Sequence, residues 1–388
     1  MEAVGQALPA PLLTPAFVAL TLSELAYFTS TGVLLAATPL FVTGPLAGDA
    51  AGVGLVMGSF SVSTLALRPF TGRWVDRRGR RPLLIGGAGL FAAVALGHLL
   101  ATELAVLVVL RLLLGVAEAM YFVAGFAALA DLAPPGRTGE ALSLNSLALY
   151  GGIALGPIIG QAVLSWRGFG PAWVGAAALS LTAALLATRI PETRPDGDEV
   201  APTPLLHRGA LVPAFALFCG VAAMAGFLAF AVVHARAVGL ETWSLVMVLF
   251  GATVVVCRTV FARLPDRVEP MRLVSVSLLV TAAGFVLLGS VPRPAAVLGG
   301  ALLLGVGTAF LTPAVFAAVF AAVPASERGS AAATTSIFID LGFGGGPMLL
   351  GAVAAATTIP VGFLLLTAVP VLGTLVASAH RPAHVAVT

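Results

Sequence analysis

The sequence predicts an all-α membrane protein with twelve transmembrane helices, arranged as two parallel repeats of six. Composition is the first observation behind this prediction: 59% of the 388 residues are hydrophobic and only 10% are charged, whereas soluble domains carry about 25% charged residues. The second is a series of apolar runs that are long enough to cross a bilayer. The third is the return of matching residues 190 positions later in the chain.

Twelve apolar runs define the expected crossings. Each is close to the roughly 20 residues that a helix needs to span a hydrocarbon core of about 30 Å. Short polar or glycine- and proline-containing turns separate the runs. The expected crossings are residues 15–42, 51–71, 82–101, 104–130, 139–165, 171–190, 209–234, 242–262, 271–290, 294–322, 329–356 and 358–379.

The two halves of the chain carry matching residues at a constant spacing. Arg68 and Asp76 are followed 190 residues later by Arg258 and Asp266, and several glycine and proline positions match in the same way. Because each unit has an even number of crossings, both units have the same orientation in the membrane and form parallel repeats. The expected domains are residues 1–190 and 209–388, each a six-helix bundle, and a cytoplasmic linker over 191–208.

The densest charge cluster lies between the second and third expected crossings, in residues 72–82. Charge of this density cannot remain in hydrocarbon, so the segment must be an aqueous turn. With the N-terminus inside, fourteen arginines fall in cytoplasmic segments and three outside, as the positive-inside rule predicts. All 20 basic residues are arginine, a composition typical of GC-rich bacterial genomes. We therefore expect a multi-pass protein of the bacterial cytoplasmic (inner) membrane with both termini in the cytoplasm.

Other functional classes lack their sequence signatures. The arginines lie at expected membrane boundaries, so the basic balance does not indicate a nucleic-acid partner. Cys219 and Cys257 both fall in apolar runs, which provides neither a disulfide framework nor a CxxC metal site. The sequence contains no Walker-type GxxxxGK[ST], and no nucleophile–base pair is evident. We therefore expect neither ATP hydrolysis nor enzymatic catalysis.

Three carboxylates inside expected crossings are the main candidates for proton coupling: Glu24, Glu118 and Asp340. At 1.5 Å per residue each lies roughly 13–18 Å from the inner end of its helix, near mid-bilayer, where transporters bind substrates and ions. Ionisable groups at this depth are costly, so they are functional candidates by default. An alternative for Asp340 is contact with a cationic substrate. A structural alternative is that Glu118 forms an ion pair with Arg111 and that Asp340 only bonds to the backbone.

Several polar and aromatic residues are expected to line a central cavity together with these acids. Tyr27 and Thr31 share the helical face of Glu24, and Arg111 lies two turns from Glu118 on one face. The fifth expected crossing contributes two more side chains. The expected cavity residues are Tyr27, Thr31, Arg111, Asn145 and Tyr150.

Four further ionisable residues are expected to have no part in binding. Arg68 and Arg258 lie about two turns before their loop aspartates, from where long side chains can reach the inner surface. His98 and His234 lie near expected outer helix ends, where we expect solvated imidazoles.

Four short motifs lie inside the expected crossings or at their ends. They are Gly72-x-x-x-Asp76-Arg77-x-Gly79-Arg80-Arg81, Arg111-x-x-x-Gly115, Gly152-x-x-x-Gly156-Pro157-x-x-Gly160 and Pro191-Glu192-Thr193-Arg194. The first resembles the loop between helices 2 and 3 of the major facilitator superfamily of secondary transporters. The others resemble that family's helix 4, the helix 5 of its proton-coupled exporters and the end of its helix 6. The helix-5 motif departs from the family pattern at Gln161, where a second glycine is usual.

The resemblance implies a conformational latch at the arginine-rich loop. In the family pattern Asp76 faces the N-terminus of the eleventh crossing, and Arg80 pairs with Asp131 at the inner end of the fourth. These contacts are expected to join the two halves in the outward-facing state and to break in the other. A simpler reading, in which the arginines only fix orientation, stays open. The expected latch residues are Gly72, Asp76, Arg77, Gly79, Arg80 and Asp131.

The glycine–proline motif of the fifth crossing recurs in the eleventh. Small residues four apart allow close helix contact, and proline bends a helix by removing a backbone hydrogen bond. We expect both motifs to form seams at which the two halves rock against each other. The expected seam residues are Gly152, Gly156, Pro157, Gly342, Gly346 and Pro347.

These observations together predict a secondary transporter that exports small amphipathic or cationic compounds in exchange for protons by alternating access. Proton-coupled uptake of a sugar or other nutrient uses the same fold and is the first alternative. A membrane protein that senses a ligand without cycling is the second. The expected partners are a small-molecule substrate and the lipid bilayer. We expect a monomer that needs no metal or organic cofactor, with H⁺ as the coupling ion.

Overall fold

The computed structural model describes residues 11–134, 137–194, 207–261, 264–323 and 327–379. Within these ranges it describes all side chains except those of residues 69, 76, 138–140, 142–143, 265–266 and 328–330. In this part of the chain every regular element is a helix. The prediction of an all-α membrane fold is therefore confirmed.

The first six crossings are long helices whose starts are determined by local chemistry. Thr14 Oγ1 accepts a hydrogen bond from Phe17 N at 3.2 Å, and Asp49 Oδ1 accepts one from Gly52 N at 2.8 Å, which caps two helices. Gly79 ends one helix and starts the next with a φ of +92°, a conformation that favours glycine. The elements are α1 (Pro15–Thr43), α2 (Ala50–Arg78), α3 (Arg80–Gly97), η1 (His98–Leu100), α4 (Leu104–Leu132), α5 (Thr138–Arg167) and α6 (Phe169–Ala187).

The second six crossings are less regular. The eighth, expected over 242–262, is a helix of only 16 residues, because a turn precedes it and a separate short helix follows. The twelfth divides at Thr367, where Pro370 cannot donate a hydrogen bond to the carbonyl of Leu366. The elements are η2 (Arg208–Ala210), α7 (Leu211–Ala237), α8 (Leu245–Val260), α9 (Leu264–Arg267), α10 (Pro270–Ser290), α11 (Pro294–Ala322), α12 (Arg328–Ala356), α13 (Ile359–Leu366) and α14 (Ala368–Ala379).

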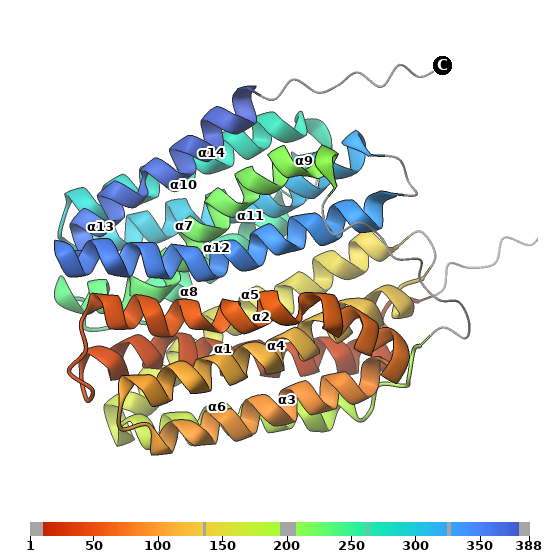
Figure 1. Ribbon diagram of the computed structural model, residues 1–388, viewed down its shortest axis with the longest axis horizontal. Helices are drawn as coiled ribbons and strands as arrows, with labels where there is room; N and C mark the ends of the chain where they lie inside the picture. The colour runs from red at the N-terminus through yellow and green to blue at the C-terminus, as the bar shows by residue number, and fades with distance from the viewer. Residues whose placement is uncertain (1–10, 135–136, 195–206, 262–263, 324–326, 380–388) are drawn as a thin grey trace, which may run out of the picture.

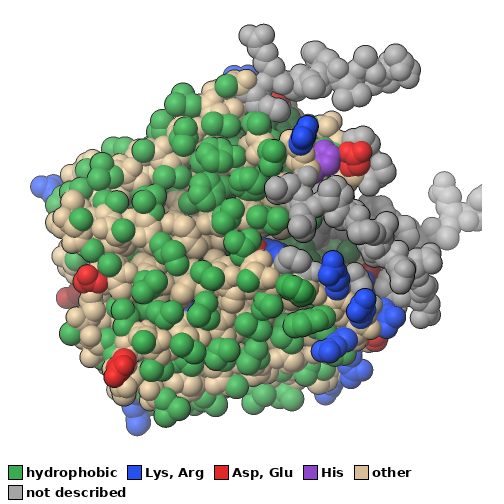
Figure 2. Space-filling model, viewed as in Figure 1, with side chains coloured by type: hydrophobic (Ala, Val, Ile, Leu, Met, Phe, Trp, Pro, Cys, Tyr) green, Lys and Arg blue, Asp and Glu red, His purple; other side chains and the backbone are tan. Residues whose placement is uncertain are grey.

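The outer surface suits a lipid environment. Eleven segments of the described chain are long and apolar enough to cross a membrane, with α13 and α14 counted as one, and α8 is a shorter apolar helix. Hydrophobic side chains cover the flank in Figure 2, whereas charged side chains gather at the two ends. We call the end that carries residues 72–82, where α2 ends and α3 starts, the arginine-rich end, and the other the opposite end.

The helices form two bundles, which we call the first half (α1–α6) and the second half (α7–α14). They lie one above the other in Figure 1. One hydrophobic core lies within the first half and includes Trp173. The core around Phe285 of the second half extends across the interface to Leu40 of α1 and Val53 of α2. Between the halves α2 packs along α12, and α5 packs along α8 (Figure 1).

The halves are in close backbone contact toward the opposite end. A Cβ atom on Gly54 of α2 would lie 2.5 Å from the carbonyl oxygen of Pro347 in α12. A Cβ atom on Gly251 of α8 would lie 2.8 Å from the Cβ of Ala154 in α5. Small residues are needed at both crossings, because any larger side chain would separate the helices.

Candidate functional site

A central cavity of about 180 Å³ lies between the two halves. Helices α1, α2, α3, α4, α5, α7 and α12 contribute to its wall. Five phenylalanines and several aliphatic side chains make most of this wall apolar. The polar residues among those that line it are Thr31, Ser61, Thr64, Arg68, Arg111, Glu118 and Asp340.

Arg68 and Asp340 join the two halves at the cavity wall. The guanidinium of Arg68 in α2 donates two hydrogen bonds to the carboxylate of Asp340 in α12, from Nε to Oδ2 at 2.6 Å and from Nη2 to Oδ1 at 2.8 Å. The prediction that Arg68 snorkels to the inner surface is therefore wrong. So is the alternative in which Asp340 only bonds to the backbone. Each charge finds its partner in the other half, which sequence spacing alone cannot reveal.

Arg258 also points toward the other half. Its Nε donates to the carbonyl of Ala309 at 3.2 Å, and its Nη2 lies 3.5 Å from the hydroxyl of Tyr150 in α5. The guanidinium carbon lies 4.7 Å from the centroid of the Tyr150 ring, within cation–π range. The snorkelling prediction is wrong for Arg258 as well, because an aromatic partner in the first half holds it inside.

Arg111 and Glu118 both line the cavity but do not form the ion pair that the structural alternative requires. Arg111 Nε donates to the carbonyl of Val56 at 3.3 Å, and its guanidinium lies 5.3 Å from the centroid of the Phe60 ring. The Oε2 atom of Glu118 is buried and has no hydrogen-bond partner among the described residues. Glu118 interacts electrostatically with the charges of Arg68, Arg111 and Asp340.

Glu24 lies behind the cavity wall, inside the first half. Its Oε2 accepts a hydrogen bond from Asn145 Nδ2 at 2.5 Å, and both residues are only 3% exposed. A Cβ atom on Gly125 of α4 would lie 2.7 Å from Glu24 Oε1, so the absence of a side chain at Gly125 makes room for this carboxyl group. The Oδ1 atom of Asn145 is also buried and has no partner in the described chain.

Two tyrosines lie next to these acids. The rings of Tyr27 and Tyr121 stack with centroids 3.9 Å apart, and the hydroxyls of Tyr121 and Ser23 lie 2.7 Å apart. Two of the five predicted cavity residues, Thr31 and Arg111, line the cavity. The other three, Tyr27, Asn145 and Tyr150, do not line it. Sequence reasoning missed Ser23, Tyr121 and Gly125, since nothing in a helical repeat shows which polar face meets Glu24.

His98 and His234 are each only 1% exposed, so the prediction of solvated imidazoles is wrong. His98 Nδ1 lies 2.9 Å from the carbonyl of Val94, and His234 Nε2 lies 3.0 Å from that of Leu288. Both rings pack against aromatic side chains, Trp173 for His98 and Phe363 for His234. Side chains from other helices thus bury both imidazoles, which their position in the sequence does not indicate.

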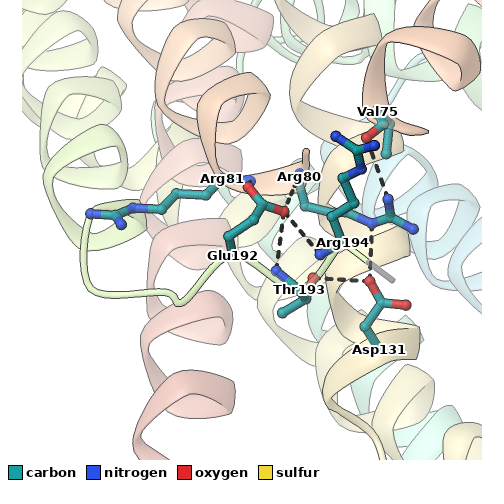
Figure 3. Close-up of polar contacts among 7 residues, drawn as sticks. All are labelled: Val75, Arg80, Arg81, Asp131, Glu192, Thr193 and Arg194. Carbon is teal, nitrogen blue, oxygen red and sulfur yellow. Dashed lines mark hydrogen bonds and ion pairs between the residues drawn. The ribbon is translucent and has the colours of Figure 1, made fainter. Parts of the chain in front are cut away.

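The arginine-rich segment takes part in a polar network within the first half and the start of the linker (Figure 3). The prediction of a turn over residues 72–82 is wrong, because α2 continues to Arg78 and α3 starts at Arg80, which leaves Gly79 alone between them. Arg80 Nε donates to Asp131 Oδ2 at 3.0 Å, the pairing that the family pattern implies, and Thr193 Oγ1 donates to the same oxygen at 2.9 Å. Glu192 Oε1 accepts from the backbone N of Arg80 at 2.8 Å, and its Oε2 accepts from that of Arg81 at 3.2 Å. A linker carboxylate thereby caps the positive N-terminus of α3.

The remaining latch residues behave differently from one another. The Arg77 carbonyl accepts a hydrogen bond from Arg194 Nη1 at 2.9 Å, and a Cβ atom on Gly72 would meet open space. The side chain of Asp76 lies outside the described part of the structure. Because Arg80 and Asp131 both belong to the first half, their contact does not by itself join the halves. That part of the latch prediction is wrong.

The glycines of the predicted seams pack inside each half. A Cβ atom on Gly156 would lie 2.5 Å from the carbonyl oxygen of Thr29 in α1, and one on Gly346 would overlap the carbonyl of Ala222 in α7. Gly152 and Gly342 meet the same two helices. The seam prediction is therefore wrong for the four glycines and for Pro157, which packs near Gly32 of α1. Pro347 is the exception, since its carbonyl meets Gly54 in the other half.

Gln161 joins the halves at the opposite end. Its Oε1 accepts a hydrogen bond from Ser244 N at 2.6 Å, and its Nε2 donates to the carbonyl of Glu241 at 3.2 Å. Gln161 lies in α5, and both partners precede α8 in the second half. The residue at which the helix-5 motif departs from the family pattern thus makes a contact that glycine could not make.

Comparison with known proteins identifies the family. The Major Facilitator Superfamily profile matches residues 20–291 and 214–387. An uncharacterized MFS-type transporter of Burkholderia mallei (strain SAVP1) is 32% identical over 349 residues, which cover 86% of this chain and 84% of the relative. Another, of Salmonella typhimurium (strain LT2), is 28% identical over 358 residues, which cover 88% of this chain and 90% of the relative.

Solved structures share the fold at low sequence identity. One is a bacterial homologue of the human lysosomal transporter Spinster in an inward-facing and occupied conformation. It superposes with a TM-score of 0.77 at 15% identity, and the superposition covers 93% of this chain and 95% of the homologue. The nucleoside transporter NupG superposes with a TM-score of 0.75 at 15% identity, and the superposition covers 94% of this chain and 98% of NupG. The profile match and the Burkholderia relative establish that this chain belongs to the Major Facilitator Superfamily of membrane transporters.

Proposed function

We propose that this transporter exports small amphipathic compounds, cationic ones included, in exchange for protons by alternating access. The observation that carries the proposal is the placement of two acids in the first half. Glu118 lies at the cavity wall with one carboxyl oxygen free of hydrogen bonds among the described residues, and Glu24 lies behind it, bonded to Asn145.

Neither acid forms an ion pair with a cation in the described chain, so no arginine holds either carboxyl group in its ionised form. In a low-dielectric environment a carboxyl group without a cationic partner is favoured in its neutral form. Entry of water or of a cationic substrate changes that balance. A site of this kind can take up a proton when it opens to one side of the membrane and release it on the other.

The cavity wall supports an amphipathic substrate. Its surface is mainly apolar with a few polar groups, which is the composition of sites for small organic ligands. The acid Glu118 is available to a cation or a hydrogen-bond donor of the ligand, whereas Arg68 and Asp340 satisfy each other.

The positive-inside rule supports a cytoplasmic arginine-rich end and cytoplasmic termini. The close contacts at the opposite end then face the outside, and the cavity is closed on that side. We propose that the protein works in this orientation as a monomer in the bacterial cytoplasmic membrane, with the bilayer as its surroundings and H⁺ as its coupling ion.

Transport into proteoliposomes with an imposed pH gradient tests the proposal, with ethidium, norfloxacin and xylose as probes. We expect a probe to accumulate on the acidic side, where it exchanges for departing protons. Accumulation on the alkaline side would show proton symport instead. The Glu24→Gln and Glu118→Gln variants should lose gradient-driven accumulation and keep probe–probe exchange. Glu103→Gln, at an exposed position before α4, is the control, and gradient-driven transport by both buried variants would refute the proposal.

A further inference from the structure

Two contacts between the halves are equivalent under the 190-residue repeat. Arg68 of α2 corresponds to Arg258 of α8, and Tyr150 of α5 corresponds to Asp340 of α12. Arg68 binds Asp340, and Arg258 lies on Tyr150. In each half, one arginine therefore contacts a residue at the equivalent position of the other half. The partner of Arg68 is a carboxylate, and the partner of Arg258 is a phenol.

A second pair of contacts shows that the equivalence extends along both interfaces. A Cβ atom on Gly344 of α12 would lie 3.2 Å from the Cβ of Ser61 in α2, and one on Gly251 of α8 would lie 2.8 Å from the Cβ of Ala154 in α5. Ser61 corresponds to Gly251 and Ala154 to Gly344. The α2–α12 and α5–α8 interfaces thus share one register, in which the arginine contact lies nearer the arginine-rich end.

The Arg68–Asp340 contact lines the central cavity, and the Arg258–Tyr150 contact lies next to it. Along α2, Arg68 is the lining residue nearest the arginine-rich end. Along α12, Ile339 and its neighbour Asp340 are the lining residues nearest that end. In α5 the lining residue nearest that end is Leu149, and Tyr150 directly follows it in the chain. The charged contact therefore lies at the end of the cavity nearest the arginine-rich end along α2 and α12, and the Arg258–Tyr150 contact lies beside the cavity at the equivalent level of α5 and α8.

We propose that Arg68–Asp340 and Arg258–Tyr150 are the two leaves of one gate, which closes the cavity toward the arginine-rich end. The charged leaf controls opening. Its two short hydrogen bonds join ionised groups whose side chains are 22% and 8% exposed, and charge-assisted bonds of this geometry are the strong ones. The phenol leaf has one long hydrogen bond and a cation–π contact, which is weaker and tolerates sliding. Both leaves are contacts between protein side chains, so the gate is the same whichever substrate and coupling ion the transporter uses.

Removal of one partner of the charged leaf should open the gate. An arginine that loses its carboxylate inside the protein is unpaired and poorly hydrated, so states in which water reaches it become more favourable. The reporter is Thr31→Cys in a Cys219→Ala/Cys257→Ala background, since Thr31 lines the cavity and bonds only to its own helix at Tyr27. A membrane-impermeant maleimide is applied from each side of vesicles of known orientation, and the labelling rate is measured without substrate.

We expect Asp340→Asn and Arg68→Gln to raise the labelling rate from the arginine-rich side about tenfold. The charge-exchanged variant Arg68→Asp/Asp340→Arg should restore most of the protection. Tyr150→Phe keeps the ring and should label at close to the parent rate. Arg68→Lys keeps the charge but loses the two-pronged geometry, so it should give an intermediate rate and serves as the test if a neutral variant does not fold. An unchanged rate in folded Asp340→Asn or Arg68→Lys, or a rise only from the opposite side, would overturn the proposal.

Discussion

Gly156 of α5 and Gly32 of α1 touch through their backbones: a Cβ atom on Gly156 would lie 2.6 Å from the Cα of Gly32. The counterpart in the second half brings Gly346 of α12 against Ala222 of α7. The motif thus fastens the fifth helix of each half to the first helix of the same half. Since α5 and α12 also carry Tyr150 and Asp340, each half can move as a unit that includes its side of the gate.

Gly156→Ala should destabilise the protein by about 1–3 kcal/mol, because the added methyl group meets backbone atoms that cannot move independently. The control is Gly160→Ala in the same helix, where the nearest atom lies at an ordinary 3.6 Å. Thermal unfolding of the detergent-solubilised variants measures the difference. Equal midpoints for the two variants would show that α1 and α5 separate easily.

Glu192→Gln should lower stability by about 1 kcal/mol, the usual value of a helix cap. Glu192 accepts hydrogen bonds from the first two amides of α3, and its charge faces the positive helix end. Glu103 also precedes a helix but makes no capping hydrogen bond, so Glu103→Gln is the matched control. The unfolding midpoint should fall for Glu192→Gln alone, and more at low than at high salt. A similar fall in both variants would contradict the capping role.

Gln161→Ala should loosen the opposite end, since it removes both side-chain hydrogen bonds to the segment before α8. Spin labels at Thr43→Cys and Thr357→Cys, exposed positions on the two halves at that end, report the separation by pulsed electron resonance. We expect a larger population of long distances in Gln161→Ala. Ser165→Ala is the control, because Ser165 bonds only to its own helix at Ala162. An unchanged distance distribution would mean that the glycine contacts alone hold this end.

The local parts of the site could be predicted from the sequence. Glu24 and Glu118 were recognisable because a carboxylate inside a long apolar run has few explanations, and the Arg80–Asp131 contact followed from the resemblance of the loop motif. The roles of Arg68 and Arg258 could not be predicted. Each lies close enough to a helix end for its side chain to reach the membrane surface, and the neighbouring residues do not indicate a partner in the other half.

The sequence by itself determined the number and order of the crossings, the family and the presence of acids inside the apolar helices. The cost of polar groups in hydrocarbon acts on every short segment separately, so it can be read along the chain. The tertiary structure decided which partner each buried charge has. Arg68 and Asp340 lie 272 residues apart, and their contact depends on how the two halves dock. That docking depends on glycine contacts and helix faces that no single segment specifies.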